Sequence, residues 1–286
     1  MREVREAEEV KEAKEANENS SRVAAFFDLD GTLMPLPSLE KRLFRMLRYR
    51  REIRLKNYFL WLMEAARFIP RGIHTIAQPN KVYLRGVRSL DERELGIRDE
   101  FPGHTGVGQQ DEGEASATPF EKTRRNPREP VLSFFEEGVE RVAWHASQGH
   151  VIVIVSGTLE PLANAAGREL EGEVAARRVA TKIHVCATRL EKENGRWTGR
   201  ILGEAMFGET KARALKKLTE EMELDLARCY AYGNSANDQW MLAAVGNAIA
   251  VNPAPKLTRI AKKCRWLVLK WNEKKGLTRR TQRRRD

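Results

Sequence analysis

The 286-residue sequence has only three cysteines, Cys186, Cys229 and Cys264. They are odd in number, far apart and set in apolar or mixed segments, which argues against a disulfide framework and against a metal site built of cysteines. We therefore interpret them as buried thiols of a protein in a reducing cytoplasm.

The sequence also lacks a long apolar run. The nearest approach to one, residues 58–63, runs for only six residues before Glu64, whereas a membrane-spanning helix needs about 20 apolar residues. Residues 1–19 contain seven glutamates and four basic residues without an apolar centre, which is not the composition of a secretory signal. We expect that segment to be a solvated helix or disordered, and we expect no membrane span.

An excess of acidic residues is absent too, since the net charge is +11. The charge is unevenly placed: residues 41–56 hold eight Lys or Arg against the single acid Glu52, and residues 274–285 hold seven more basic residues. Such clusters attract a phosphorylated substrate, an acidic membrane surface or nucleic acid, so their sign alone does not choose a partner.

Apolar runs and helical periodicities alternate along the chain. The runs over 23–27 and 151–155 are typical of strands buried on both faces of a parallel sheet. This alternation predicts an α/β fold with a doubly wound, Rossmann-like sheet. The other predicted elements are helices over 133–148, 160–170, 209–222, 235–245 and 255–263, a hairpin at 194–195, and strands over 229–232, 248–251 and 266–269.

A helical cap is predicted directly after the first strand. Ser38 is the expected N-cap of an amphipathic helix whose apolar face carries Leu39 and Leu43. A second helix over 55–69 carries an aromatic stripe, and because such stripes mostly face cores we favour core packing over contact with a membrane surface. The stripe consists of Tyr58, Phe59, Trp61 and Phe68.

The predicted organisation has five parts. They are a charged N-terminal segment over 1–20, an α/β core over 21–36 and 131–270, a helical cap over 37–90, a flexible loop over 91–130 and a basic C-terminal tail over 271–286.

Two carboxylates, Asp28 and Asp30, follow the first strand at a Gly-Thr turn. Strand residues two apart share a face, and acids held that close repel unless a cation lies between them or one stays protonated. Either condition suits catalysis. A capping acid and a turn acid would explain an arbitrary pair, but the string Asp-x-Asp-Gly-Thr after an apolar strand favours a functional site.

Two further segments suit an anion. Ser156 and Gly157 follow the strand over 151–155, where a hydroxyl and backbone N–H groups at a helix N-terminus form a phosphate site. Lys211 stands at the start of the helix over 209–222, against the positive end of the helix dipole, a position that also suits an anion. Taken singly, an ordinary cap and an ordinary surface lysine stay open as explanations.

A fourth segment follows the strand over 229–232 and contains Asn234, Asn237 and Asp238. Their oxygens suit a hard cation such as Mg²⁺, with an Asn or Ser cap and an exposed helix acid as the alternative. All four segments follow strands or begin helices, and open α/β sheets bind their ligands beyond the carboxyl ends of strands.

Together the four segments resemble the motifs of the haloacid dehalogenase (HAD) superfamily of phosphohydrolases, and most closely its phosphoserine-phosphatase-like branch, subfamily IB. The resemblance covers roughly residues 22–39 and 131–270, with a weaker match through the cap. The matching positions are 28–32, Ser156, Lys211 and 233–238, with further similarity at 155–161, 198–200 and 250–253.

The resemblance implies a Mg²⁺-dependent phosphomonoester hydrolase acting on a small or lipid-like substrate. Asp28 would attack phosphorus to form an aspartyl-phosphate, and Asp30 would protonate the leaving alcohol and later activate water. The implied phosphate-binding residues are Ser156, Gly157, Lys211 and Asn237, and the implied metal-binding residues are Asp28, Asp30, Asn234 and Asp238.

One position departs from the family pattern, in which the fourth motif commonly begins with Asp. Here position 234 is Asn, a neutral ligand that removes one negative charge from the metal site. We expect Asp238 to take over part of that charge.

Two other hypotheses stay open. The same nucleophile would serve a phosphotransferase, and the basic clusters would serve a non-catalytic protein bound to an anionic membrane or to nucleic acid. Nucleic acid is the less favoured partner, because a pure binding module has no use for Asp28, Asp30 and Lys211 together. A peripheral contact of the basic cap helix with an anionic membrane is compatible with the enzyme hypothesis. The sequence specifies neither the substrate nor the oligomeric state.

Overall fold

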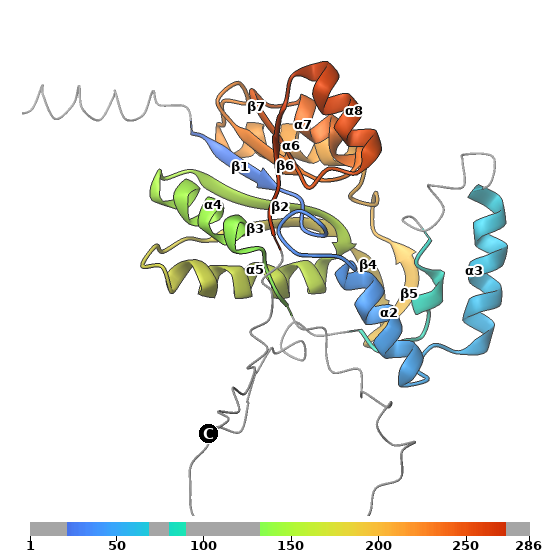
Figure 1. Cartoon of the computed structure of the whole chain (residues 1–286). Helices are drawn as coiled ribbons and strands as arrows, with labels where there is room; N and C mark the ends of the chain where they lie inside the picture. The colour runs from blue at the N-terminus through green and yellow to red at the C-terminus, as the bar shows by residue number, and fades with distance from the viewer. Residues whose placement is uncertain (1–21, 69–79, 90–131, 273–286) are drawn as a thin grey trace, which may run out of the picture.

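The computed structural model of the chain describes residues 22–68, 80–89 and 132–272. At its centre lies a six-stranded sheet of order β3-β2-β1-β6-β7-β8, in which every neighbouring pair is parallel (Figure 1). This confirms the predicted α/β doubly wound parallel sheet. The strands are β1 (Ala24–Phe27), β2 (Val151–Leu159), β3 (Ile183–Thr188), β6 (Tyr230–Gly233), β7 (Asn247–Val251) and β8 (Leu267–Leu269).

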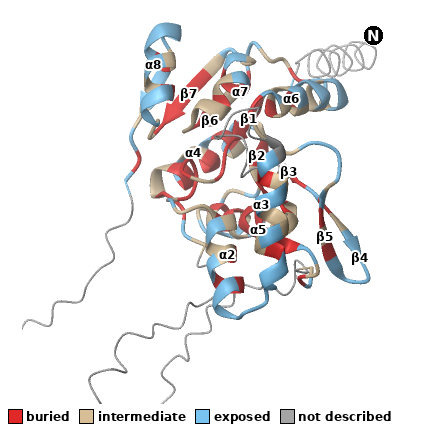
Figure 2. Ribbon diagram, turned by 90° about the vertical axis from the view of Figure 1, so that its right-hand side faces the viewer, coloured by how far each residue is buried: buried red, intermediate tan, exposed pale blue. Residues whose placement is uncertain are grey.

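Helices cover both faces of this sheet because its central strands are apolar on both sides. In β1, Ala25 and Phe27 belong to one buried cluster with α4 (Glu136–Ser147) and α5 (Glu160–Ala175). Ala24 and Phe26, which alternate with them, belong to a second cluster on the opposite face. That face is covered by α6 (Glu209–Met222), α7 (Gln239–Ala243) and α8 (Pro255–Cys264), and Figure 2 shows the buried residues concentrated between these layers.

The position of β1 sets the position of the site. Its neighbours are β2 on one side and β6 on the other, so the strand order runs outward from β1 in both directions. A crevice forms at such a switch point, beyond the carboxyl ends of the strands. Those ends point toward α2 (Leu39–Tyr49) and α3 (Leu55–Phe68), the helices that follow β1 (Figure 1).

These two helices and a short 3-10 helix, η3 (Val82–Leu84), lie between β1 and α4 in the chain. The predicted N-cap is confirmed, because the Ser38 hydroxyl accepts the backbone N–H of Lys41 at 3.3 Å. The predicted hairpin is confirmed as β4 (Leu190–Glu193) and β5 (Arg196–Ile201), which pair antiparallel around the Asn194-Gly195 turn. The hairpin packs on η3, and the Gly86 N–H donates to the carbonyl of Trp197 at 2.7 Å.

Three elements differ from the prediction. The second strand continues through Ser156 to Leu159, with an irregular register against β3. Ser156 therefore lies within the strand and not at the N-terminus of α5, where it was expected. β3 itself was not predicted, because half-buried His184 and Cys186 interrupt its apolar pattern. The helix predicted over 235–245 is a 3-10 turn, η5 (Ala236–Asp238), followed by the short α7.

Several side chains also differ. The expectation of three buried thiols is wrong, because Cys229 is buried but Cys186 is half-buried and Cys264 is exposed. Core packing holds for Tyr58 and Trp61 but not for Phe59, which is 64% exposed. Trp271, assigned to the basic tail, is buried and packs against rings of the core.

The predicted segments 1–20 and 91–130, and all of the tail beyond residue 272, lie outside the described residues. The five-part division of the chain therefore stays a prediction. No helix within the described ranges is long and apolar enough to cross a bilayer.

Candidate active site

A cavity of about 700 Å³ lies at the carboxyl ends of β1, β2 and β6, between the sheet and the cap helices. All eight residues predicted from the sequence line it, so segments up to about 210 residues apart meet in one place. They are Asp28, Asp30, Ser156, Gly157, Lys211, Asn234, Asn237 and Asp238. Their individual roles stay predictions.

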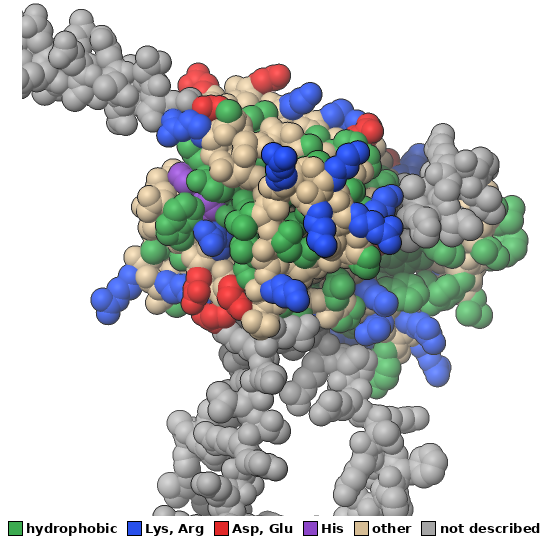
Figure 3. All heavy atoms as spheres, turned by 45° about the horizontal axis from the view of Figure 1, so that its top comes forward, with side chains coloured by type: hydrophobic (Ala, Val, Ile, Leu, Met, Phe, Trp, Pro, Cys, Tyr) green, Lys and Arg blue, Asp and Glu red, His purple; other side chains and the backbone are tan. Residues whose placement is uncertain are grey.

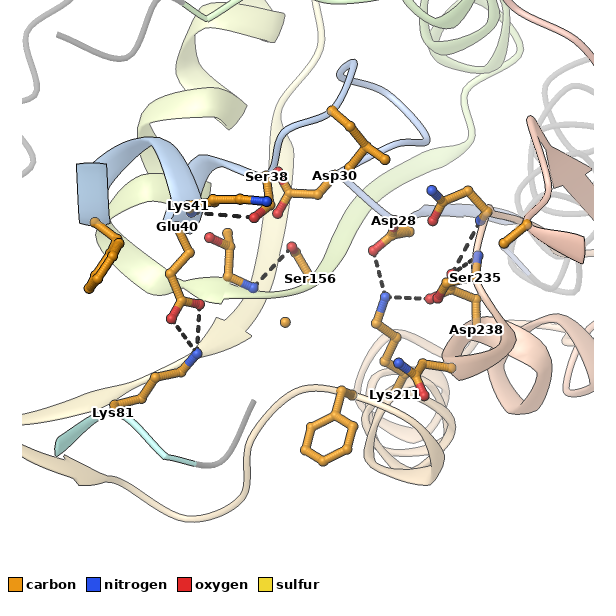
Figure 4. A pocket seen from close by; sticks show the side chains of 18 of the residues that line it. Asp28, Asp30, Ser38, Glu40, Lys41, Lys81, Ser156, Lys211, Ser235 and Asp238 are labelled. Carbon is orange, nitrogen blue, oxygen red and sulfur yellow. Dashed lines mark hydrogen bonds and ion pairs between the residues drawn. The ribbon is translucent and has the colours of Figure 1, made fainter. Parts of the chain in front are cut away.

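Lys211 forms ion pairs with two carboxylates of this site, those of Asp28 and Asp238. Its Nζ lies 2.6 Å from Asp28 Oδ1 and 2.6 Å from Asp238 Oδ1, and all three residues are buried (Figure 4). Burial opposes the charge of the lysine, but the carboxylates of Asp238 and Asp28 outweigh it and hold the pKa of Lys211 above its ordinary value. Lys211 is therefore a permanent cation between two carboxylates.

Asp28 follows β1 directly, and its backbone N–H continues the sheet by donating to the carbonyl of Tyr232 at 2.9 Å. Its Oδ2 accepts the hydroxyl of Thr32 at 3.0 Å. Burial raises the pKa of Asp28 to about 7 although Lys211 lowers it, and Asp238 and Asp30 add to the rise. The carboxylate is thus held in a fixed direction in an environment where its negative charge is poorly compensated.

Gly31 is required by the turn that follows. Its φ is +88°, and a Cβ at this position would lie 2.0 Å from Nδ2 of Asn234. The glycine therefore allows the side chain of Asn234 to lie close to the loop that carries both aspartates.

Asp30 does not share a strand face with Asp28, because both residues lie beyond the end of β1. Its Oδ1 accepts the backbone N–H of Leu39, at the start of α2, at 2.8 Å. Burial raises the pKa of Asp30 to about 6, although the Leu39 hydrogen bond lowers it. Figure 4 shows Asp30 near Ser38 and Asp28 toward Lys211.

Asp238 is engaged at both oxygens. While Oδ1 binds Lys211, Oδ2 accepts the backbone N–H groups of Asn234 and Ser235, at 3.2 and 2.8 Å, and the Ser235 hydroxyl at 2.8 Å. Ser235 and Asp238 thus form a capping box at the start of η5. The carboxylate fixes both Lys211 and the loop that carries Asn234.

The end of β2 contributes hydroxyls. The hydroxyl of Ser156 accepts the backbone N–H of Thr158 at 3.2 Å, and the Gly157 carbonyl accepts the Thr188 hydroxyl at 2.9 Å. The hydroxyl of Thr158 is buried at the cavity wall and has no hydrogen-bond partner within the described part of the chain. No role was predicted for Thr158, and its buried hydroxyl at the cavity wall makes it a candidate for a further hydrogen bond to a ligand.

The cap side of the cavity has a different character. Nζ of Lys81, which is 2% exposed, lies 2.5 and 2.6 Å from the two carboxylate oxygens of Glu40, and Tyr83 donates to Glu40 Oε1 at 2.7 Å (Figure 4). Nothing in the sequence indicates this cluster, since Glu40 has the position of an ordinary acid in the first turn of a helix. Ser38 and Lys41 also line the cap side, whose apolar and aromatic residues are Leu36, Phe44, Tyr58 and Trp61.

The charges at the sheet end of the cavity fit a divalent cation. Three carboxylates, those of Asp28, Asp30 and Asp238, meet one ammonium group, that of Lys211. In the described ranges no three His, Cys, Asp or Glu side chains converge as ligands of one ion. A cation here would therefore be held by at most two carboxylates, together with neutral oxygens such as the amide of Asn234.

The fold places the chain among the doubly wound α/β proteins, and comparison with known proteins gives the family. The sequence model of the haloacid dehalogenase-like hydrolase family matches residues 25–243. The chain therefore belongs to this family, as its motifs predicted.

Curated relatives come from Mycobacterium tuberculosis. A probable phosphatase is 36% identical over 138 residues, which are 48% of this chain and 44% of that protein. The phosphoserine phosphatase SerB1 is 42% identical over 79 residues, 28% of this chain and 26% of that protein. The chain thus spans less than half the length of the curated relatives it matches.

Solved structures agree on the fold. A Bordetella pertussis protein of unknown function is 27% identical, with a TM-score of 0.56 over 87% of this chain and 99% of that one. A substrate-bound phosphoserine phosphatase has a TM-score of 0.52 over 88% of this chain and 94% of that one, and at 16% identity it shows the fold alone.

Proposed function

We propose that this chain is a Mg²⁺-dependent phosphomonoester hydrolase that works through an aspartyl-phosphate on Asp28. The observation that carries the proposal is the bridge of Lys211 between Asp28 and Asp238, in one cavity with Ser156. A lysine held this way orients a carboxylate and leaves a cation facing the space where a phosphoryl group would lie. The phosphatase named among the relatives supports the same reaction class.

In the first step a carboxylate oxygen of Asp28 attacks phosphorus, and the bond from phosphorus to the ester oxygen breaks. Asp30 gives its proton to the departing alcohol oxygen. In the second step water attacks the acyl phosphate, its proton passes to Asp30, and inorganic phosphate leaves as the carboxylate of Asp28 is restored. The raised pKa of Asp30, about 6, keeps a protonated fraction available near neutral pH.

Other residues hold the phosphoryl oxygens. Lys211 supplies a fixed positive charge, and Ser156, the Gly157 backbone and Asn237 line the same end of the cavity. A bound Mg²⁺, held by the carboxylate of Asp28, the backbone carbonyl of Asp30 and the amide of Asn234, would offset the negative charge of the phosphoryl group. Asp238 belongs to the same proposed metal set and acts most directly by orienting Lys211.

For the substrate we propose a small or lipid-like phosphate ester, because the cavity joins a charged end to a cap side with several apolar and aromatic residues. A cytoplasmic location is part of the proposal and is supported by the three free cysteines.

The test is phosphate release from a generic aryl phosphate by the full chain, with Mg²⁺ and with a chelator. Asp28→Asn should abolish the Mg²⁺-dependent release, whereas Asp225→Asn, which changes an aspartate in a turn outside the cavity, should leave it unchanged. Full activity of Asp28→Asn would refute the assignment of the nucleophile.

A further inference from the structure

The helix α3 presents an apolar face to solvent. Leu55 is 88% exposed, Phe59 64%, Leu62 62% and Met63 56%. Their spacing of four, seven and eight residues places them on one side of the helix. A surface helix normally turns its polar residues outward, so this face is inverted with respect to an ordinary solvated helix.

The opposite side of α3 accounts for its attachment to the cap. Asn57 is buried and donates to the carbonyls of Tyr83 and Arg85, at 3.1 and 2.7 Å. The carbonyl of Trp61 accepts Nδ2 of Asn80 at 2.9 Å, and Tyr58 packs edge-on against Phe44 of α2 at 6.4 Å between ring centroids. The helix is therefore held with its exposed apolar face directed away from the cap.

A basic surface adjoins this face. Of the eight Lys and Arg in residues 41–56, seven are exposed, and the eighth, Arg42, donates to the carbonyls of Pro35 and Pro37. The basic residues adjoin the apolar face in the sequence, because Arg54 and Lys56 flank Leu55. Figure 3 shows hydrophobic side chains gathered on the α3 side of the molecule, with Lys and Arg beside them. The seven are Lys41, Arg45, Arg48, Arg50, Arg51, Arg54 and Lys56.

We propose that the exposed apolar face of α3 and the basic surface beside it form a docking surface for an anionic lipid bilayer. Large apolar side chains beside cations match the boundary between acyl chains and anionic headgroups. A second copy of the chain fits less well, since a twofold interface would bring the same basic residues of both copies together. Nucleic acid would satisfy the cations but leave Leu55, Phe59 and Leu62 exposed to water.

The surface lies next to the cavity of the active site. Tyr58 and Trp61, which alternate in the sequence with the exposed Phe59 and Leu62, line the cavity from α3. Lys41 of the basic surface lines it from α2. A docked cap would thus bring the cavity close to the membrane surface. The docking itself is independent of the proposed hydrolysis and is tested without it.

The experiment is co-sedimentation of the full chain with vesicles of phosphatidylcholine alone and of phosphatidylcholine with phosphatidylglycerol. We expect binding to the anionic vesicles only. Phe59→Ser/Leu62→Ser should weaken it on the order of tenfold, by loss of apolar insertion. Arg48→Gln/Arg51→Gln/Arg54→Gln should weaken it on the order of 100-fold, since each cation near an anionic surface contributes about a factor of five.

Two matched control variants make the same types of substitution at exposed residues outside the cap. Lys256→Gln/Lys262→Gln/Lys263→Gln removes three exposed charges from α8, and Leu202→Ser/Leu267→Ser removes two exposed leucines. Both should bind like the unaltered chain, and hydrolysis of an aryl phosphate without vesicles should be the same in all four variants. Equal binding by the cap variants and the controls would overturn the proposal. So would binding lost on deletion of residues 273–286 alone, or a dimer that Phe59→Ser/Leu62→Ser dissociates.

Discussion

Lys211 Nζ lies 2.6 Å from the carboxylate of Asp28, a residue 183 positions away in the sequence. The same Nζ lies 2.6 Å from Asp238, so one cation offsets two buried carboxylates. These contacts join the start of α6 to the residue after β1 and to η5, which follows β6, so the stability of the fold depends on the charges of the site.

Replacing the lysine should therefore destabilise the protein strongly. Lys211→Met removes the cation paired with the carboxylates of Asp28 and Asp238, and breaking a buried ion pair in this way costs on the order of 3–5 kcal/mol. The pKa of Asp28, about 7 even with the lysine present, should rise further. A raised folded-state pKa of an acid gives stability that is lost as pH rises, so the deficit should be larger at pH 8 than at pH 5.

Urea unfolding at both pH values measures the difference. Lys217→Met is the matched control on α6, because its ion pair with Glu221 is exposed and should contribute less than about 1 kcal/mol. A deficit that does not depend on pH would argue against unpaired carboxylates as its cause.

Thr158→Val tests the buried hydroxyl beside Ser156. If the hydroxyl donates to a phosphoryl oxygen, its loss should lower kcat/KM about 10- to 100-fold, the range for a hydrogen bond to a charged group. Folding stability should not fall, because the hydroxyl has no partner within the described residues. Thr198→Val, on β5 outside the cavity, should leave kcat/KM unchanged. Unaltered kinetics in Thr158→Val would remove Thr158 from the site.

A buried histidine on the other face of the sheet, His145 of α4, should make the stability depend on pH. His145 is fully buried, with Nε2 2.8 Å from the Tyr232 hydroxyl and Nδ1 2.8 Å from Nδ1 of His150. Burial, together with His150 and Arg141, lowers the pKa of His145 to about 3. Below pH 6.5 the unfolded chain binds a proton that the folded one excludes, so stability falls as the pH falls from 6.5 toward 3.

The contribution of one such histidine is at most about 1.4 kcal/mol per pH unit. In His145→Gln the unfolding free energy should therefore depend less steeply on pH across this window. The same slope in the variant and the unaltered chain would show that His145 is not the responsible group.

Asn234→Asp restores the negative charge that the family pattern has at this position. We expect it to tighten Mg²⁺ binding, measured by titration of the metal in the absence of substrate. Asn247→Asp is a control, since Asn247 lies on β7 outside the active-site cavity and its amide donates to backbone carbonyls. Unchanged or weaker affinity in Asn234→Asp would exclude Asn234 as a ligand.

The sequence predicts the sheet well because buried parallel strands need continuous apolar runs, which are visible at 23–27 and 151–155. It misses β3 because an edge strand is half-buried and tolerates His184 and Cys186. The site is predictable for a related reason: the carboxyl ends of parallel strands meet at one edge, so polar residues following separate strands converge there.

Features that depend on tertiary packing were not predictable. Glu40 and Lys81 are two of many charged residues, and nothing local indicates that they pair across 41 positions. Tyr58 and Phe59 are neighbours in one aromatic stripe, yet neighbours on a helix point about 100° apart. Tyr58 therefore packs against the core, whereas Phe59 is largely exposed. The direction of Asp30 likewise depends on where α2 begins.

The most direct test of the account is to trap the covalent intermediate. The full chain is mixed with a phosphomonoester and Mg²⁺, quenched in acid within one turnover, digested and mapped by mass spectrometry. We predict one phosphoryl group, labile to hydroxylamine, on the peptide that contains Asp28, and none in Asp28→Asn. Turnover without any phosphorylated peptide, or with the phosphoryl group on another residue, would contradict the account.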